Sequence, residues 1–295
     1  MVAIREGRMP YKGFETYYRI TNPDGKKAPL VLLHGGPGST HNYFEGFDKL
    51  AESIDRPIVM YDQIGCGESA TPGHTELYNA DVWMDELDAL REHLNLEKVH
   101  LLGQSWGGML AISYMMERDP EGVLSIVLAS TLHSAILWRE EQWRRIYRFM
   151  SKKDQDIFNR AEASDNYEDP EYLKALDRFM DMYCGPTITE DSPEYLKREK
   201  KNSGEVYLTG WGANEFGPTG TLASYDYRGQ LAKITVPVLV TNGQMDLCSC
   251  YIAKSMYDEL PNSRWELFRY SRHMAFVEEE EKYFEMMRDW LKDFD

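Results

Sequence analysis

One short stretch, residues 99–116, constrains the fold of this chain more than any other part of it. It reads VHLLGQSWGGMLAISYMM, an apolar run typical of a buried strand followed by a run typical of a helix. Ser105 lies at the joint, with Gly103 and Gly107 two residues before and after it. A strand that turns this sharply into a helix strains its apex residue and leaves no room for neighbouring side chains. The stretch therefore predicts a tight strand–turn–helix unit with a serine hydroxyl at its apex.

The pattern G-x-S-x-G in this setting is that of a nucleophile elbow, in which a serine ends a central strand and precedes a helix. The helix N-terminus offers unpaired N–H groups and the positive end of a dipole, which stabilise negative charge on a substrate oxygen. The pentapeptide alone arises by chance in many proteins. The strand and helix character of its flanks is what favours the catalytic interpretation.

Size and charge limit the function classes. The chain has 295 residues, enough for one large domain or for a domain with an insertion. Its 33 Lys and Arg against 49 Asp and Glu give a net charge of −16, and it contains no block of basic residues. We therefore expect no binding to nucleic acid or to anionic membranes, and we expect a cationic substrate to be attracted.

The sequence also predicts a cytoplasmic protein without a metal. No run of about 18 apolar residues is present, and the first twenty residues carry charges throughout, unlike a secretory signal. The four cysteines are few and scattered, as in a reducing compartment. Cys248 and Cys250 are spaced too tightly for the usual C-x₂-C zinc pair, so we expect no metal site there.

The order of apolar runs predicts an α/β fold. Runs that begin near residues 28, 56, 98 and 123 alternate with helical stretches, which is typical of a mostly parallel central sheet with helices on both faces. The alternating segment GFETYYRI, residues 13–20, is expected to form an exposed edge strand of a hairpin. A further apolar strand precedes residue 246, and a strand, a loop and a helix end the chain.

Residues 131–230 interrupt this rhythm. They are charged, rich in aromatic residues and helical in pattern, and no buried strand is expected among them. We expect an α/β core of residues 1–130 and 231–295, with residues 131–230 as an all-helical cap. Because ligands bind beyond the carboxyl ends of strands in open α/β sheets, this cap would form a lid over the site.

A serine hydroxyl needs a base, and the base needs an acid that holds it in the right tautomer. On this fold the chain order is serine, acid, histidine. Asp246 directly follows an apolar strand and His273 follows a short one, so the order predicts a triad of Ser105, Asp246 and His273. Taken singly, Asp246 reads as a turn residue and His273 as a loop residue. His41 and His133 are expected to lack a matching partner acid.

The loop HGGPG, residues 34–38, predicts the second half of an oxyanion hole. Acyl transfer requires two N–H donors, one after the nucleophile and one from the loop after an early strand. We expect the N–H groups of Trp106 and Gly36 in these roles, and Gly35 to let the substrate approach the backbone. A phosphate-binding loop is the rival interpretation, but no Gly-Lys-Ser/Thr follows.

With HGGPG, YDQIGCGES at residues 61–69 and GQSWGG at residues 103–108, the chain resembles the proline iminopeptidase group of α/β hydrolases. The resemblance extends over essentially the whole chain, including the cap. It implies an α/β-hydrolase fold and removal of an N-terminal residue, often proline, from short peptides, amides or arylamides. It also implies Ser105, Asp246 and His273 as the triad, with no metal or other cofactor.

The resemblance implies a further role for one cap residue. The family places a glutamate in a motif similar to GANEFGPTG, which assigns recognition of the substrate's ammonium group to Glu215. Some members carry a second glutamate directly after the triad aspartate, where this chain has Leu247. Cap aromatic side chains could line a pocket, although most are expected to be cap core: Trp138, Trp143, Tyr207, Trp211 and Phe216.

Three function classes follow. The first is an aminopeptidase or amino-acid amidase acting on a small peptide or amide. The second is an esterase or lactonase, which Leu247 favours and which Glu215 and the net charge oppose. The third is a catalytically silent binding module, which the intact Ser, Asp and His in order oppose. The sequence carries no prediction of the oligomeric state.

Overall fold

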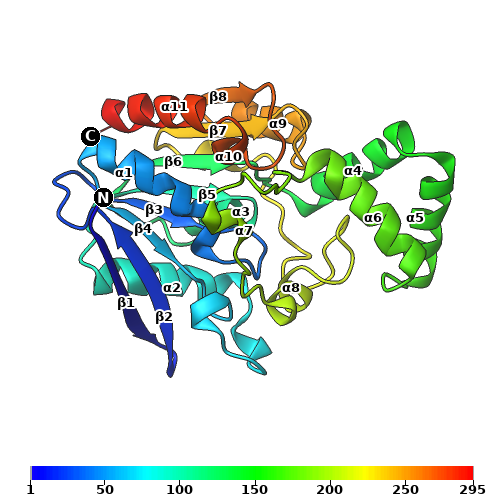
Figure 1. The fold of residues 1–295 in the computed structure, drawn as a ribbon, viewed down its shortest axis with the longest axis horizontal. Helices are drawn as coiled ribbons and strands as arrows, with labels where there is room; N and C mark the ends of the chain where they lie inside the picture. Colours follow the sequence, from blue (N-terminus) through cyan, green and yellow to red (C-terminus); the bar gives the residue numbers. More distant parts are fainter. Residues whose placement is uncertain (1, 295) are drawn as a thin grey trace.

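The computed structural model describes residues 2–294, and its central feature is one eight-stranded sheet (Figure 1). The strands lie in the order β1-β2-β4-β3-β5-β6-β7-β8. All pairs from β4 to β8 across the sheet are parallel, whereas β1–β2 and β2–β4 are antiparallel. The strands are β1 (Ile4–Tyr11), β2 (Phe14–Thr21), β3 (Leu30–Leu33), β4 (Ile58–Tyr61), β5 (Val99–Gln104), β6 (Val123–Ala129), β7 (Val238–Gly243) and β8 (Ser263–Phe268). The predicted mostly parallel sheet is confirmed.

The hairpin at the start of the chain differs from the prediction in one respect. The segment expected at the edge of the sheet is β2, which is hydrogen-bonded to β1 on one side and to β4 on the other. The edge strand is β1, whose sequence IREGRMPY carries charges and a proline rather than a clear alternation. Charged side chains and proline are typical of exposed sheet edges, because they discourage pairing with another chain.

Helices cover both faces of the sheet (Figure 1). The α-helices are α1 (Asp48–Ile54), α2 (Ala80–His93), α3 (Trp106–Glu117), α4 (Ala135–Phe149), α5 (Lys152–Ser164), α6 (Pro170–Tyr183), α7 (Glu194–Lys197), α8 (Gly204–Gly210), α9 (Cys250–Glu259), α10 (Ala275–Glu278) and α11 (Glu280–Asp293). Short 3₁₀ helices are η1 (His41–Phe47), η2 (Gly67–Ser69), η3 (Thr75–Leu77) and η4 (Leu231–Lys233). None of the helices within residues 2–294 is both long and apolar enough to cross a bilayer.

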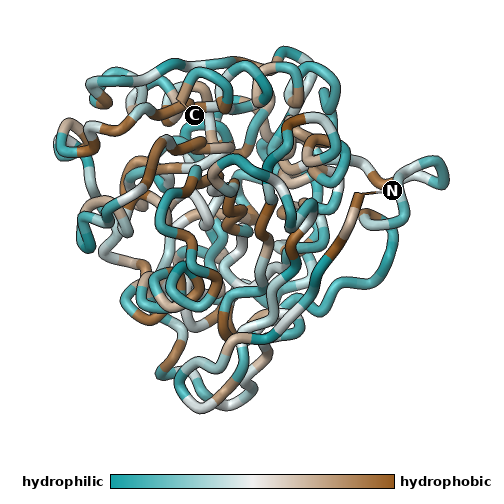
Figure 2. Tube along the Cα trace, turned by 90° about the vertical axis from the view of Figure 1, so that its left-hand side faces the viewer, coloured by the Kyte–Doolittle hydropathy of each residue, from teal (hydrophilic) through white to brown (hydrophobic). Residues whose placement is uncertain are grey.

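Alternation along the buried strands divides the core into two layers. Val31 and Leu33 of β3 belong to the layer that includes α2, α3 and α9, whereas Leu30 and Leu32 belong to the layer of α1 and α11. Successive strand side chains point to opposite faces, so a run of four apolar residues serves both layers. Figure 2 shows the hydrophobic segments gathered inside the molecule and hydrophilic ones along its outside.

The chain between β6 and β7 is helical. Helices α4 to α8 lie there, and the β-type pairing described within residues 131–230 is the isolated bridge from Ser134 to Asp226. Local signals begin the first two of these helices, because the hydroxyls of Ser134 and Ser151 accept hydrogen bonds from N–H groups three residues later. Aromatic rings form the interior of this region. The rings of Phe158 and Phe216 pack edge to face, with their centroids 5.2 Å apart.

One carboxyl group is buried in the core. Glu86 of α2 has no exposed surface, and it accepts hydrogen bonds from the Thr16 hydroxyl and, at 2.9 Å, from the Ile64 N–H. Burial raises the pKa of Glu86 to about 8, although both hydrogen bonds act in the opposite direction. The folded protein therefore holds this proton over a range of pH in which the unfolded chain has released it.

Stability is expected to fall as the pH rises from about 5 to about 8, because the folded state binds the Glu86 proton more tightly than the unfolded state does. The slope from this group is at most about 1.4 kcal/mol per pH unit. Glu86→Gln should flatten the dependence, as measured by urea unfolding at several pH values. Glu92→Gln, at an exposed position of α2, is the matched control. Equal slopes of the free energy of unfolding against pH in Glu86→Gln and wild type would contradict a raised pKa for Glu86.

Candidate active site

Ser105 adopts the strained backbone that the sequence predicts for the apex of the turn. Its φ and ψ are 55° and −122°, and it directly precedes α3. The Ser105 N–H donates to the Ala129 carbonyl at 3.0 Å, and the Ser105 carbonyl accepts from the Thr131 hydroxyl at 2.6 Å and from the Gly108 N–H at 2.9 Å. These bonds hold an unfavourable conformation in place.

The glycines on either side of Ser105 are required by contact. A Cβ on Gly103 would lie 2.2 Å from the Gly107 carbonyl oxygen, and a Cβ on Gly107 would lie 1.9 Å from the Leu33 carbonyl oxygen. Both contacts are to backbone atoms, which cannot move aside as a flexible side chain can. The start of α3 therefore approaches the backbone of β3 as closely as the predicted turn demands.

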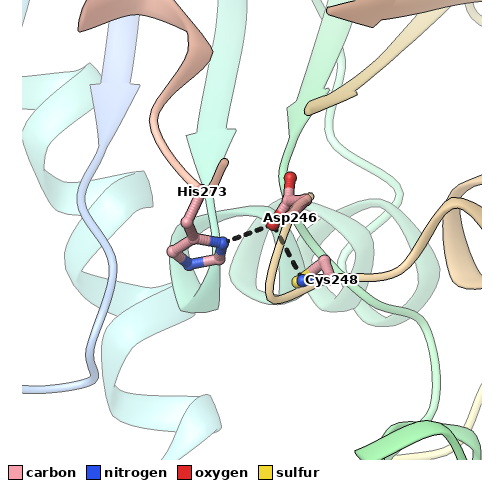
Figure 3. Close-up of side chains that lie close together, drawn as sticks. All are labelled: Asp246, Cys248 and His273. Carbon is pink, nitrogen blue, oxygen red and sulfur yellow. Dashed lines mark hydrogen bonds and ion pairs between the residues drawn. The ribbon is translucent and has the colours of Figure 1, made fainter. Parts of the chain in front are cut away.

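His273 and Asp246 form a buried hydrogen-bonded pair (Figure 3). His273 Nδ1 and Asp246 Oδ1 are 2.7 Å apart, with Asp246 fully buried and His273 6% exposed. Oδ1 also accepts from the Cys248 N–H at 2.8 Å, and Oδ2 accepts from the Gly243 N–H at 3.2 Å. Because the carboxylate only accepts hydrogen bonds, His273 Nδ1 carries the proton, which leaves Nε2 as the basic nitrogen.

Gln104 links this pair to the turn. Its Nε2 donates to the His273 carbonyl at 3.3 Å, and its Oε1 accepts from the Tyr43 hydroxyl at 2.9 Å. Since Gln104 is the residue before Ser105, the histidine loop is fastened directly beside the apex of the turn. The three residues that the sequence selected are thus held at one edge of the sheet by separate loops.

Cys248 completes a cluster of possible metal ligands with Asp246 and His273. Ligand atoms of the three residues all lie within 4.8 Å of one another (Figure 3). However, the Cys248 thiol donates to the Ser130 carbonyl at 3.0 Å, and burial raises its pKa well above the ordinary value. The donor set is therefore a protonated thiol beside a hydrogen-bonded carboxylate–imidazole pair, which suits proton transfer better than metal binding.

A neutral histidine shapes the glycine loop after β3. His34 Nδ1 donates to the Gly35 carbonyl at 2.9 Å, and its Nε2 accepts from the Gln63 N–H at 3.0 Å. Burial lowers the pKa of His34 to about 4, so the ring stays neutral and can accept this bond. The Gln63 side chain in turn bonds the His34 carbonyl at 2.9 Å and the Trp106 Nε1–H at 2.8 Å. The loop and α3 are thereby fixed to each other.

The N–H groups of Gly36 and Trp106 are among the backbone amides at this place that have no acceptor within residues 2–294. Trp106 is the first residue of α3, where an N–H has no partner inside the helix. Gly36 has a φ of 113°, a conformation that glycine adopts without strain. Both amides remain available to an external oxygen.

Gly35 lies against Ser105. A Cβ at Gly35 would come within 2.7 Å of Gln104 Oε1 and 3.1 Å of Ser105 Cβ. Its N–H donates to the Tyr43 hydroxyl at 2.6 Å, and its carbonyl accepts from His34. The N–H and the carbonyl of Gly35 are therefore both hydrogen-bonded within the protein. Because Gly35 has no side chain, it leaves space beside Ser105.

Glu215 lies in the loop that follows α8. The Tyr207 hydroxyl donates to its carboxylate, and the indole N–H groups of Trp138 and Trp211 bond its carbonyl at 3.0 and 3.2 Å. Burial raises the pKa of Glu215 to about 7, while Tyr207 and the charge of His273 act in the opposite direction. The carboxylate thus lies within electrostatic reach of the His273–Asp246 pair and is only weakly solvated.

Two histidines have acidic partners, contrary to the prediction from the sequence. His41 Nδ1 lies 2.7 Å from Asp62 Oδ1, and His133 Nε2 lies 3.5 Å from Glu259 Oε1. Asp62 also accepts from the His41 N–H at 2.8 Å and the Glu68 N–H at 2.9 Å, so it organises a turn. Chain order alone carries no signal for such pairs, because their members meet only through packing.

The loop after Asp246 also makes contacts that no sequence pattern predicted. Leu247 is 4% exposed, and its carbonyl accepts hydrogen bonds from Gln142 Nε2 and Arg145 Nη1, both at 3.0 Å. Both donors belong to α4.

The aromatic residues of the cap are mainly core, as expected: Trp138, Trp211 and Phe216 are buried, while Trp143 and Tyr207 are partly buried.

Comparison with known proteins gives concordant results. A family profile described as alpha/beta hydrolase fold matches residues 28–280. Proline iminopeptidase of Clostridioides difficile (strain 630) is 60% identical over 290 residues, 98% of this chain and 98% of that protein. Proline iminopeptidase of Clostridium botulinum is 53% identical, again over 98% of both chains. The crystal structure of proline iminopeptidase from Mycobacterium smegmatis superimposes with a TM-score of 0.87 at 28% identity over 98% of both chains. VinJ superimposes with a TM-score of 0.88 at 32% identity over 99% of both chains.

A methyl group at Gly35 should disable Ser105 without unfolding the chain. Gly35→Ala would push Ser105 and Gln104 out of place, since the added Cβ has contacts of 2.7 and 3.1 Å. We expect labelling of Ser105 by a fluorophosphonate probe to slow about tenfold or more, which corresponds to about 1.4 kcal/mol. Gly204→Ala, where an added Cβ meets nothing within 4 Å, is the control. Equal labelling rates for the two variants would show that the close contact is harmless.

Proposed function

The chain belongs to the proline iminopeptidase family of alpha/beta hydrolases, and on this premise we propose that it is a serine aminopeptidase releasing N-terminal proline from short peptides, amides or arylamides. The observation that carries the proposal is the buried His273–Asp246 pair, 2.7 Å apart, fastened through Gln104 beside the strained Ser105. A base, its orienting acid and a nucleophile within reach of the substrate are what acyl transfer by a serine enzyme requires.

In the proposed mechanism Ser105 attacks the carbonyl carbon of the first residue, and His273 Nε2 takes the hydroxyl proton. Asp246 holds the Nδ1 proton and stabilises the imidazolium that forms. His273 then protonates the leaving amine, which departs with the rest of the peptide. A water molecule deprotonated by the same histidine hydrolyses the acyl-enzyme, releasing the amino acid and restoring Ser105.

The oxyanion of each tetrahedral intermediate is assigned to the N–H groups of Gly36 and Trp106. This assignment is supported by their lack of an acceptor within residues 2–294 and by the position of Trp106 at the start of α3. Donors held in place before the reaction need no reorganisation when charge develops. Gly35 contributes by the space it leaves for the substrate beside Ser105.

Glu215 is proposed to bind the ammonium group of the substrate. Its weakly solvated carboxylate supports this role, because a charge-assisted bond is stronger where water is excluded. The net charge of −16 would add long-range attraction for a cationic substrate. The Leu247 position supplies no second carboxylate, so the proposed recognition of the amine depends on Glu215.

We further propose that residues 131–230 act as the lid over an α/β core of residues 1–130 and 231–295. The position of Glu215 in this segment supports the proposal, since a lid that binds the substrate amine must reach the proposed catalytic pair.

A cytoplasmic location is proposed from the four cysteines, which are all free.

The first test compares prolyl, alanyl and leucyl arylamides with their N-acetylated forms and with simple acyl esters. We expect cleavage of the free-amine substrates, with proline preferred. Ser105→Ala should lower kcat/KM for prolyl arylamide by roughly 10³-fold or more while leaving the melting temperature unchanged. Ser164→Ala, at an exposed serine of the cap, is the control. Equal cleavage of N-acetylated amides and esters would refute an aminopeptidase and favour an esterase.

Glu215 is expected to act through its charge. KM for prolyl arylamide should fall as the pH rises through about 7, because Glu215 is ionised only above its raised pKa. Glu215→Gln should raise KM about 10- to 100-fold, as expected for loss of a charge-assisted hydrogen bond, and should abolish this pH dependence. Glu199→Gln, at an exposed glutamate of the cap, should behave as wild type. An unchanged KM in Glu215→Gln would remove this residue from the amine site.

A further inference from the structure

Helix α4 holds the loop that carries Asp246. Glu141 Oε2 accepts a hydrogen bond from the Ser249 hydroxyl at 2.7 Å, while Gln142 Nε2 and Arg145 Nη1 both donate to the Leu247 carbonyl at 3.0 Å. These three side chains lie within about one turn of the helix, on one face. The loop of the catalytic acid is therefore fastened to the helical segment as well as to the sheet from which it emerges.

The guanidinium of Arg145 is unusual within this contact. Arg145 is 6% exposed, and it stacks over the Tyr183 ring with its Cζ 4.5 Å from the ring centroid. Within residues 2–294 no carboxylate oxygen lies within 4.0 Å of its guanidinium nitrogens. An arginine stays protonated in proteins, so this is a buried cation without a contact ion pair. Such an arrangement costs free energy, and it calls for a functional explanation.

We infer that Arg145 is a positioning residue for the catalytic acid, which with Gln142 fixes the Leu247 carbonyl and thereby the orientation of the Asp246 carboxylate toward His273. The inference rests on the proposed function, because it concerns the same triad. Arg145 does not touch the reacting atoms; it acts through the neighbour of Asp246 in the chain. The cation supplies charge in addition to a hydrogen bond, whereas Gln142 supplies only the bond.

The charge of Arg145 has a partner in the site. Asp246 is the strongest of the acidic influences that oppose the effect of burial on the pKa of Arg145. Glu215, Cys184 and Cys248 also interact electrostatically with the His273–Asp246 pair. Tyr183 and Glu141 act on Arg145, and Arg272, with its ion-pair partner Glu278 at 2.9 Å, acts on Cys184. Among the cations, Arg272 is neutralised at contact distance and Arg145 is not.

A cation beside the pair favours the state with Asp246 ionised and His273 neutral over the state with an added proton on the imidazole. The neutral imidazole is the form that can accept the Ser105 proton. Removal of the Arg145 charge should therefore extend the protonated, inactive form to higher pH. The acid limb of the kcat/KM profile would then move toward higher pH.

The test compares Arg145→Met, Arg145→Lys, Gln142→Met and the control Arg148→Met, an exposed arginine of the same helix. With prolyl arylamide as substrate, Arg145→Met should lower kcat about 10- to 100-fold with little change in KM, and should move the acid limb upward by about half a pH unit or more. Arg145→Lys should keep the acid limb of the kcat/KM profile at its wild-type pH and should keep part of the activity. Gln142→Met should lower kcat without moving the limb, and Arg148→Met should match wild type.

A readout independent of turnover separates this inference from the proposed function. The proton shared by His273 Nδ1 and Asp246 should give a low-field proton NMR resonance, assigned by its loss in His273→Gln. We expect Arg145→Met to shift or broaden it and Arg145→Lys to preserve it. An unchanged resonance with an unmoved acid limb in Arg145→Met would overturn the inference, as would equal losses in the Met and Lys variants. Failure of wild type to cleave free-amine substrates would refute the proposed function, while the NMR comparison would still decide the role of Arg145.

Discussion

Helix α3 approaches β3 so closely that a Cβ on Gly107 would lie 1.9 Å from the Leu33 carbonyl oxygen. This contact places the start of a helix, with its unpaired N–H groups, against the loop that follows β3. It also forces Ser105 into a backbone conformation that only surrounding hydrogen bonds can maintain. The strained Ser105, the N–H groups of Gly36 and Trp106 and the space beside Gly35 all depend on this one approach of helix to strand.

Burial acts on the charged groups of the site in different ways. Asp246 is fully buried, yet three donors satisfy it: the His273 ring and the N–H groups of Cys248 and Gly243. Glu215 has the Tyr207 hydroxyl as its carboxylate's donor, and burial raises its pKa to about 7. The first carboxylate is complete without a ligand, whereas the second gains from a cation. This difference is the physical basis for assigning orientation to one and amine recognition to the other.

The helical segment takes part in the site from two directions. Its loop after α8 supplies Glu215, and its helix α4 fastens the carbonyl of Leu247 through Gln142 and Arg145. If the proposed lid only excluded water, it would need neither contact. Leu247, the residue after Asp246, contributes its backbone carbonyl here, and a buried cation lies beside it. Movement of this segment would therefore affect the orientation of Asp246, the proposed catalytic acid, as well as access to the proposed site.

Much of this arrangement follows from local patterns. The strained turn at Ser105, the parallel strands, the helical segment, and the order of Ser105, Asp246 and His273 could be predicted from the sequence, because each depends on neighbouring residues or on chain order. Tertiary structure alone decided that β1 rather than β2 lies at the sheet edge, that His41 pairs with Asp62, and that Arg145 is buried beside the loop of Asp246. These contacts join segments that are distant in the sequence. Their partners are selected by packing and by the need to satisfy buried polar groups, and no single segment carries that information.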